Sequence, residues 1–186
     1  ISIGAWVLDE ACRQLAAWRS AGVGPRRMGV NVSVHQLRSA ALPGHVQLCL
    51  QRHGLPADCL VLELTESAAM AQPEQSIRCL QALRALGVNL SIDDFGTGYS
   101  SLAYLKLLPI QSLKLDRSFV RDLERDENDA AICAATLALA RTLGLRSVAE
   151  GVETEGQRCF LIDQGCTLLQ GFLFSRALPS AEFEAR

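Results

Sequence analysis

Apolar residues follow two alternating kinds of spacing along the chain, and this alternation predicts strands and helices in turn. Short apolar runs typical of buried strands occupy residues 28–32, 59–64, 88–92, 112–115, 146–149 and 168–169. Amphipathic stretches that predict helices occupy residues 4–21, 43–53, 73–87, 101–107, 128–143 and 154–165, with a last one starting at Ser180. Strands that alternate with helices predict a parallel sheet.

Each predicted strand ends at or near a polar side chain of a type that binds metals or catalyses reactions. In chain order these residues are Asn31, Glu63, Asp93, Lys114, Glu150 and Gln170. A β/α barrel builds its active site at the carboxyl ends of its strands. A doubly wound open sheet, the alternative architecture, usually binds its ligand at one switch point. The series therefore favours an α/β protein with a TIM-like (β/α) barrel.

The length of the chain limits how much of such a barrel it can hold. A complete barrel has eight strands and typically about 250 residues, whereas this sequence has 186 residues and six predicted strands. It also starts without a methionine, inside a predicted helix. We therefore expect residues 1–186 to form one domain that lacks its N-terminal part, including the first strand or strands of the barrel.

Composition narrows the class of protein further. Apolar residues make up 49% of the chain and charged residues 20%, which favours a folded domain. The sequence contains no apolar run of the roughly 18 residues that a membrane span needs and no secretory leader. Its seven cysteines include no Cys-x-x-Cys pair and suggest reduced core thiols in the cytoplasm. A net charge of −2 argues against binding to a DNA or RNA polymer.

The pair Asp93-Asp94, followed by a loop with two glycines, is the most informative local feature. Adjacent carboxylates repel each other unless a cation lies beside them, and their oxygens suit Mg²⁺ or Mn²⁺. The alternative is an Asp-rich turn before glycine. An Asp-Phe-Gly triplet also occurs in protein kinases, but the other kinase motifs are missing from this sequence.

Other candidate residues complete a site rich in carboxylates. Only Lys106 and Lys114 are lysines among the 18 basic residues, so a lysine at a strand end suggests a need for an amine. Lys114 could orient a water, accept its proton or stabilise phosphate charge, or it could extend to solvent. Glu63 lies on a predicted strand, and Glu66 begins the loop after it or caps a helix. The set favours two-metal phosphate chemistry.

Seven sequence blocks, in order along the whole chain, resemble the EAL domain family. They are Trp6-Val7-Leu8, Asn31-Val32-Ser33, Glu63-Leu64-Thr65-Glu66-Ser67, residues 93–102, Lys114-Leu115-Asp116, Ala149-Glu150-Gly151-Val152-Glu153-Thr154 and Gln170-Gly171. The resemblance implies metal-dependent hydrolysis of cyclic di-GMP to linear pGpG in bacterial signalling. It also implies two Mg²⁺ or Mn²⁺ ions and a homodimer.

The resemblance assigns roles to particular residues. It implies metal ligation by Asn31, Glu63, Asp93 and, partly through water, Asp94. Lys114 would assist the attacking water, with Asp94 and Glu150 beside it in catalysis. Glu66 would brace the loop after Asp93. Together with Gln170 and Glu153 it would help to bind the metal cofactor. Tyr99 and Ser100-Ser101 would couple metal binding to dimerisation.

The Glu-Ala-Leu motif that names the family, with its metal-binding glutamate, is absent from this sequence. We therefore expect this fragment alone to be poorly stable and nearly inactive. One alternative is a catalytically inactive EAL-type domain that senses cyclic di-GMP or a protein partner, and another is an interaction domain that binds no nucleotide. The resemblance further implies a cytoplasmic domain. It also implies a parent protein with upstream sensor or GGDEF-type domains. Whether that parent protein is anchored to a membrane is left open.

Overall fold

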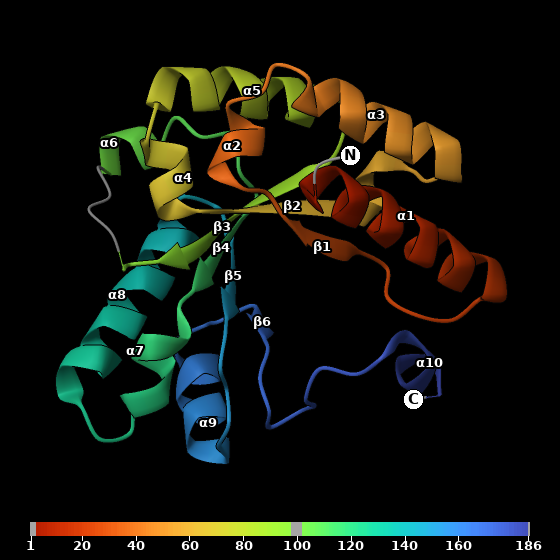
Figure 1. Cartoon of the computed structure of the whole chain (residues 1–186). Helices are drawn as coiled ribbons and strands as arrows, with labels where there is room; N and C mark the ends of the chain where they lie inside the picture. The colour runs from red at the N-terminus through yellow and green to blue at the C-terminus, as the bar shows by residue number, and fades with distance from the viewer. Residues whose placement is uncertain (1–2, 98–101, 186) are drawn as a thin grey trace. The chain divides into compact units, whose positions relative to one another are not determined.

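The computed structural model describes residues 3–97 and 102–185 and contains the six predicted strands (Figure 1). The strands are β1 (Met28–Asn31), β2 (Leu60–Thr65), β3 (Asn89–Phe95), β4 (Ser112–Leu115), β5 (Arg146–Ala149) and β6 (Leu168–Leu169). They follow one another across a sheet in chain order, β1-β2-β3-β4-β5-β6, and the residue registers of β1 with β2 and of β3 through β6 are parallel.

Helices separate the strands, as the sequence predicts. The longer ones are α1 (Ile3–Ala21), α3 (Leu42–His53), α5 (Pro73–Ala85), α8 (Glu127–Thr142) and α9 (Glu155–Asp163). The shorter ones are α2 (Val34–Leu37), α4 (Glu66–Met70), α6 (Leu102–Leu105), α7 (Arg117–Asp122), α10 (Ser180–Glu184) and the 3₁₀ turn η1 (Ala57–Cys59). None of the described helices has both the length and the apolar character needed to cross a membrane.

The chain divides into two compact units. The first contains residues 1–64, 68–90 and 178–186, and the second contains residues 65–67 and 91–177. In the first unit β1 and β2 pair in parallel, with Asn31 opposite Glu63. Along β2, Leu60, Leu62 and Leu64 are almost fully buried and alternate with more exposed residues. This alternation leaves Glu63 on the opposite face of the strand from the leucine core.

The C-terminal helix belongs to the first unit and packs on α1. Trp18 donates a hydrogen bond from Nε1 to Glu184 Oε1 at 2.6 Å, and its ring lies 5.0 Å from that of Phe183.

The core of the first unit also contains buried thiols, and burial raises the pKa of Cys12 to about 12. All seven cysteines are free, but Cys159 is exposed, so the expectation of core thiols does not hold for every cysteine.

In the second unit, α8 packs against β4 and β5 and contacts α7, and α9 lies between β5 and β6 in the chain (Figure 1). Helix α7 begins at the cap residue Asp116, which accepts a hydrogen bond from the Ser118 backbone at 2.8 Å. Helix α9 begins with a capping box between Thr154 and Gln157. The helices and strands enclose an apolar core of Leu115, Val120, Leu123, Cys133, Leu137, Ala149, Val152 and Leu161.

Candidate functional site

A bulge near the end of β3 brings the two aspartates to the same side of the strand. The pairing of β3 with β4 shifts register between Ile92 and Phe95, so Asp93 and Asp94 lie in the irregular stretch. Asp94 has a φ of 53°, the only positive φ of a non-glycine among the residues that the structure describes. Its N–H donates to Asp93 Oδ1 at 3.1 Å. A regular strand would direct neighbouring side chains to opposite faces, and the bulge removes that alternation.

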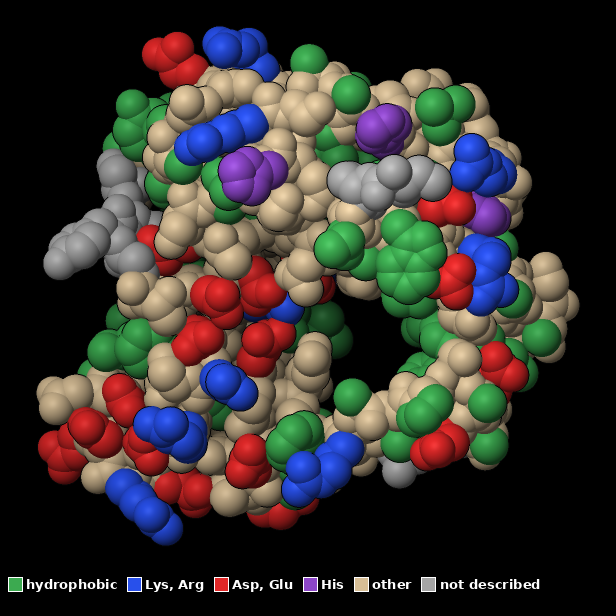
Figure 2. Space-filling model, viewed as in Figure 1, with side chains coloured by type: hydrophobic (Ala, Val, Ile, Leu, Met, Phe, Trp, Pro, Cys, Tyr) green, Lys and Arg blue, Asp and Glu red, His purple; other side chains and the backbone are tan. Residues whose placement is uncertain are grey.

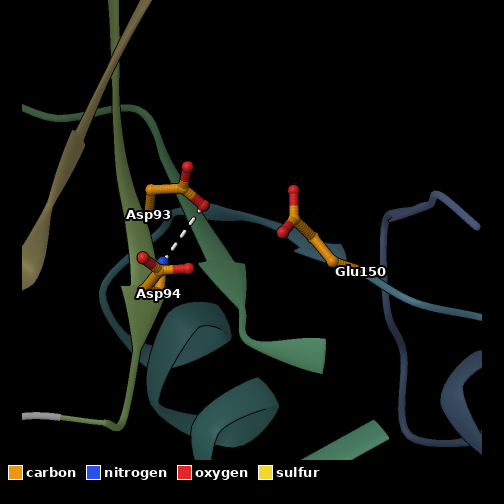
Figure 3. A group of neighbouring side chains, drawn as sticks. All are labelled: Asp93, Asp94 and Glu150. Atoms are coloured by element: carbon orange, nitrogen blue, oxygen red, sulfur yellow. Dashed lines mark hydrogen bonds between the residues drawn. The ribbon is translucent and has the colours of Figure 1, made fainter. Parts of the chain in front are cut away.

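Glu150 completes a group of three carboxylates. It follows β5 directly, and its backbone N–H donates to the Leu115 carbonyl at the end of β4 at 3.2 Å. One carboxylate oxygen from each of Asp93, Asp94 and Glu150 lies within 4.8 Å of the others. Figure 3 shows the carboxylates of Asp93, on β3, and of Glu150, just after β5, directed toward each other. Acidic side chains also gather near β3–β5 on the face shown in Figure 2.

Lys114 occupies the centre of this group. Its Nζ lies 3.0 Å from Asp93 Oδ1 and 2.7 Å from Glu150 Oε1. The three side chains are 7%, 12% and 21% exposed, for Lys114, Asp93 and Glu150 respectively. Because β4 lies between β3 and β5, its lysine can reach carboxylates from both neighbours. A buried carboxylate needs such a partner, since burial away from water strongly disfavours a lone charge.

The remaining carboxylate, Asp94, is held in an environment that disfavours its charge. Burial raises the pKa of Asp94, and the negative charge of Asp93 and a hydrogen bond with Asp116 raise it further. For Asp116, burial acts in the opposite direction to its hydrogen bonds from Ser118, and the hydrogen bonds prevail, so the pKa of Asp116 is lowered. The cluster thus carries more negative charge than one ammonium balances. Such a set of hard oxygen donors fits Mg²⁺ or Mn²⁺.

Glu66 contacts the loop that follows the two aspartates. It is 2% exposed, and its Oε2 accepts a hydrogen bond from the Gly96 N–H at 2.9 Å. Its Oε1 is buried without a hydrogen-bond partner among the described residues. This contact joins Glu66 to the loop, and the predicted role of Glu66 in bracing the loop and in the cofactor shell stays a prediction. Tyr99 and Ser100-Ser101, expected to link the loop to dimerisation, lie outside the described residues.

Gln170 and Glu153 lie near the cluster in the chain but are not members of it. Both are exposed, and the hydrogen bonds described for them use their backbones. The Gln170 N–H donates to the Ala149 carbonyl at 2.8 Å, and the Glu153 N–H donates to Gln157 Oε1 at 2.7 Å. Their predicted place in the cofactor shell stays a prediction.

Asn31 and Glu63 meet in the first unit, at the ends of β1 and β2. They are opposite each other in the parallel register, with Asn31 exposed and Glu63 partly buried. The Glu63 carboxylate lies over Gly29, where an added Cβ would stand 2.7 Å from Glu63 Oε1. Glycine therefore makes room for this side chain. The predicted role of both residues as metal ligands stays a prediction.

The reasoning from sequence gave no role to two residues that the structure places close to the cluster. Asp116 bonds with Asp94, and Gln157 binds the loop after Glu150. Each had a local signal, because aspartate is a favoured N-cap residue and Thr154-x-x-Gln157 matches a capping box. These signals predict helix starts and do not reveal which other element the side chain touches.

Comparison with known proteins identifies the family. The family model described as the EAL domain matches residues 1–177. The bifunctional diguanylate cyclase/cyclic di-GMP phosphodiesterase MucR of Pseudomonas aeruginosa is 51% identical over 185 residues, which is 100% of this chain and 27% of MucR. The chain thus spans about a quarter of the length of this relative.

Two solved structures show the same fold. The PaMucR phosphodiesterase in a c-di-GMP complex has a TM-score of 0.93 at 52% identity, over 97% of this chain and 73% of that one. The manganese/cyclic di-GMP complex of Klebsiella pneumoniae BlrP1 has a TM-score of 0.83 at 32% identity, over 93% of this chain and 44% of that one. The predicted α/β, TIM-like (β/α) fold is confirmed. The chain belongs to the EAL domain family.

Proposed function

We propose that this domain hydrolyses cyclic di-GMP to linear pGpG in a reaction that depends on two Mg²⁺ or Mn²⁺ ions. The observation that carries the proposal is the cluster of Asp93, Asp94 and Glu150 around Lys114. It supplies the oxygen donors that hard divalent ions prefer, together with one amine. MucR is named as a phosphodiesterase for this nucleotide, and both solved structures hold it.

The oxygen donors of the chain would hold the ions. We assign this role to Asp93 and Asp94 with Asn31 and Glu63, and we assign Glu150, Gln170 and Glu153 to the surrounding shell of metal and water. When bound, such ions lower the pKa of a water and stabilise the charge of a phosphoryl group. Glu66 acts on the loop after Asp93 through the Gly96 N–H and keeps the bulged strand end in place.

Lys114 has the position of a group that handles a proton. Asp93 and Glu150 fix its Nζ at the centre of the cluster, 3.0 and 2.7 Å away. There the side chain can orient the attacking water. It can accept a proton from that water only after its ammonium has given up a proton of its own to solvent, a loss that would become easier if divalent ions neutralised its two carboxylate partners. General base catalysis of this kind contributes about 10²–10⁴-fold to the rate.

We further propose a cytoplasmic location, assembly as a homodimer, and upstream sensor or GGDEF-type domains in the complete protein. The proposal also allows the complete protein to be anchored to a membrane. MucR supports the presence of further domains, because it is bifunctional and the chain matches only 27% of it.

The test is hydrolysis of cyclic di-GMP by the complete protein with Mg²⁺ or Mn²⁺, followed by chromatography of the products. We expect pGpG to form, and we expect EDTA to stop the reaction. Folded protein that forms no pGpG with either ion would contradict the proposal. Heat of cyclic di-GMP binding in a calorimeter would then indicate the inactive sensor, and no heat would indicate an interaction domain that binds no nucleotide.

A further inference from the structure

A buried glutamine joins two segments that lead away from the carboxylate cluster. Gln157 lies in the first turn of α9 and is 3% exposed. Its Oε1 accepts hydrogen bonds from the N–H groups of Glu153 at 2.7 Å and Thr154 at 3.0 Å. Its Nε2 donates to the Arg121 carbonyl, in the last turn of α7, at 3.1 Å. The amide thus acts as an acceptor on one side and as a donor on the other.

The first of these segments is the loop that carries Glu150. It runs from the end of β5 to Thr154, and Glu150 itself is held at its N–H by the Leu115 carbonyl. In the middle of the loop, Val152 is fully buried and its N–H donates to the Gln170 carbonyl at 3.1 Å. Gln157 holds the far end. The loop is therefore attached at its start, middle and end.

The second segment is α7, which follows β4 and hence Lys114. Only Leu115 and the cap residue Asp116 lie between Lys114 and the start of this helix. A second contact lies just beyond the end of α7, where Thr154 Oγ1 donates to Glu124 Oε2 at 2.6 Å. The Glu124 carboxylate also occupies the space that a side chain at position 156 would need, and that residue is glycine.

We propose that Gln157 is a positioning residue that sets the spacing between Glu150 and Lys114. It ties the segment after Lys114 to the segment after Glu150, and the two side chains meet at 2.7 Å. A small displacement of either segment would lengthen this contact and move a carboxylate of the cluster. The expected effect of Gln157 on turnover rests on the proposed function, but its effect on metal binding can be measured separately.

One substitution separates this role from that of a helix cap. Gln157→Glu keeps an acceptor for the N–H groups of Glu153 and Thr154, and glutamate is a favoured residue at this position of a capping box. Negative charge is also favourable in the first turn of a helix. A carboxylate, however, has no hydrogen to donate to the Arg121 carbonyl. If Gln157 is only a helix cap, the substitution should leave Mn²⁺ affinity and kcat unchanged. If Gln157 connects α9 to α7, both should fall.

The experiment compares the complete wild-type protein with Gln157→Glu by Mn²⁺ calorimetry, cyclic di-GMP turnover and thermal unfolding. We expect Mn²⁺ affinity and kcat each to fall by about tenfold, at the lower end of the effects seen for residues around metal ligands. KM should stay close to wild type, whereas the unfolding temperature should fall, because the new carboxylate is buried and faces the Arg121 carbonyl without a hydrogen to donate. Gln164→Glu, at the C-cap of the same helix, is the matched control and should leave Mn²⁺ affinity and kcat unchanged.

Glu124→Ala keeps the test decisive if Gln157→Glu does not fold. It removes the second contact with Thr154 but leaves the capping box intact, and we expect a measurable loss of Mn²⁺ affinity that is smaller than the tenfold loss expected for Gln157→Glu. Wild-type Mn²⁺ affinity and kcat in folded Gln157→Glu, or wild-type affinity in Glu124→Ala when the first variant does not fold, would overturn the proposal. If the wild type forms no pGpG, the proposed function fails, and Mn²⁺ affinity alone decides the role of Gln157.

Discussion

The strand ends of the two units present polar side chains in different ways. In the first unit β1 and β2 keep a regular register, and each contributes one side chain, Asn31 and Glu63. In the second unit β3 is bulged and contributes two carboxylates, and β4 places a buried lysine against them. The first pair is partly open to solvent, whereas the second group is largely enclosed.

This difference shows how a fold concentrates charge. A regular parallel ladder gives one side chain per strand on each face at a given level, so it separates like charges. The bulge places Asp93 and Asp94 together, and a left-handed backbone at Asp94 maintains that geometry. Lys114 then supplies the opposite charge that the buried carboxylates require. We expect substitutions in the second unit to have the larger effects for this reason.

Removing the lysine should have the largest effect. Lys114→Ala should lower kcat by about 10²–10⁴-fold, because it removes the proposed proton acceptor. It also leaves Asp93 and Glu150 without this buried partner, so the metal-free protein should lose about 3 kcal/mol of unfolding free energy. Added Mn²⁺ should restore much of that stability. Turnover assays and thermal unfolding with and without Mn²⁺ measure both effects, and the exposed Lys106 provides the control Lys106→Ala.

The same test applies to the ligands. Asp93→Asn should likewise reduce turnover sharply while the fold is kept. Wild-type turnover in either Lys114→Ala or Asp93→Asn would remove that residue from the mechanism.

A glycine beside Glu150 should come next. Gly151 has a φ of 72°, and an added Cβ would stand 2.6 Å from Arg117 Cβ. Gly151→Ala should therefore destabilise the protein by about 1–3 kcal/mol through backbone strain, with a further loss from the clash, and should lower kcat. Gly144→Ala is the matched control, because Gly144 has a φ of 69° and open space around it. Equal losses of stability and kcat in the two variants would show that the contact with Arg117 is unimportant.

Asp94→Asn should have opposite effects on metal binding and on stability. Loss of the carboxylate should weaken Mn²⁺ binding by about tenfold or more. In the metal-free protein the raised pKa of Asp94 means that its contribution to stability is greatest at low pH. That contribution falls as the pH rises from the ordinary Asp value through the raised one.

The substitution should therefore stabilise the metal-free protein near neutral pH and have little effect in acid. Unfolding free energies measured across this pH range, with EDTA present, provide the test. A loss of stability at neutral pH would show that the charge of Asp94 is already well compensated without a metal ion.

The smallest effect should come from the first unit. Gly29→Ala would push the Glu63 carboxylate aside, and a flexible side chain can move at little cost in stability. We expect Mn²⁺ affinity to fall by less than about tenfold, below the range for residues that orient metal ligands, with an almost unchanged unfolding temperature. Gly44→Ala, in α3 with no atom within 4 Å of the added Cβ, should leave Mn²⁺ affinity unchanged. A larger loss than that of Asp94→Asn would reverse the ranking of the two units.

The sequence predicted the strands and the residues at their ends because both depend on local patterns. Asp93, Lys114 and Glu150 do meet in the second unit, as the layout of a parallel sheet requires. The prediction for β3 stopped at Ile92, where the apolar run ends, whereas the strand continues to Phe95. The bulge depends on pairing with β4, which no local pattern reveals.

Local sequence patterns also did not predict the shortest helices or the contacts between elements. Helices α2, α4 and α7 have four to six residues, which is too short for a helical period to be visible. Likewise, the capping box of α9 was visible as a motif, but the bond from Gln157 to the Arg121 carbonyl joins residues 36 positions apart. Such contacts follow from packing and not from periodicity.

The most direct test of the central claim is a crystal structure of the complete protein with Mn²⁺, with anomalous scattering used to locate the ion. The account predicts anomalous density within coordination distance of carboxylate oxygens of Asp93 and Asp94, with Lys114 displaced from at least one of its two partners. Density elsewhere, or none, with Lys114 still bonded to both Asp93 and Glu150, would contradict it.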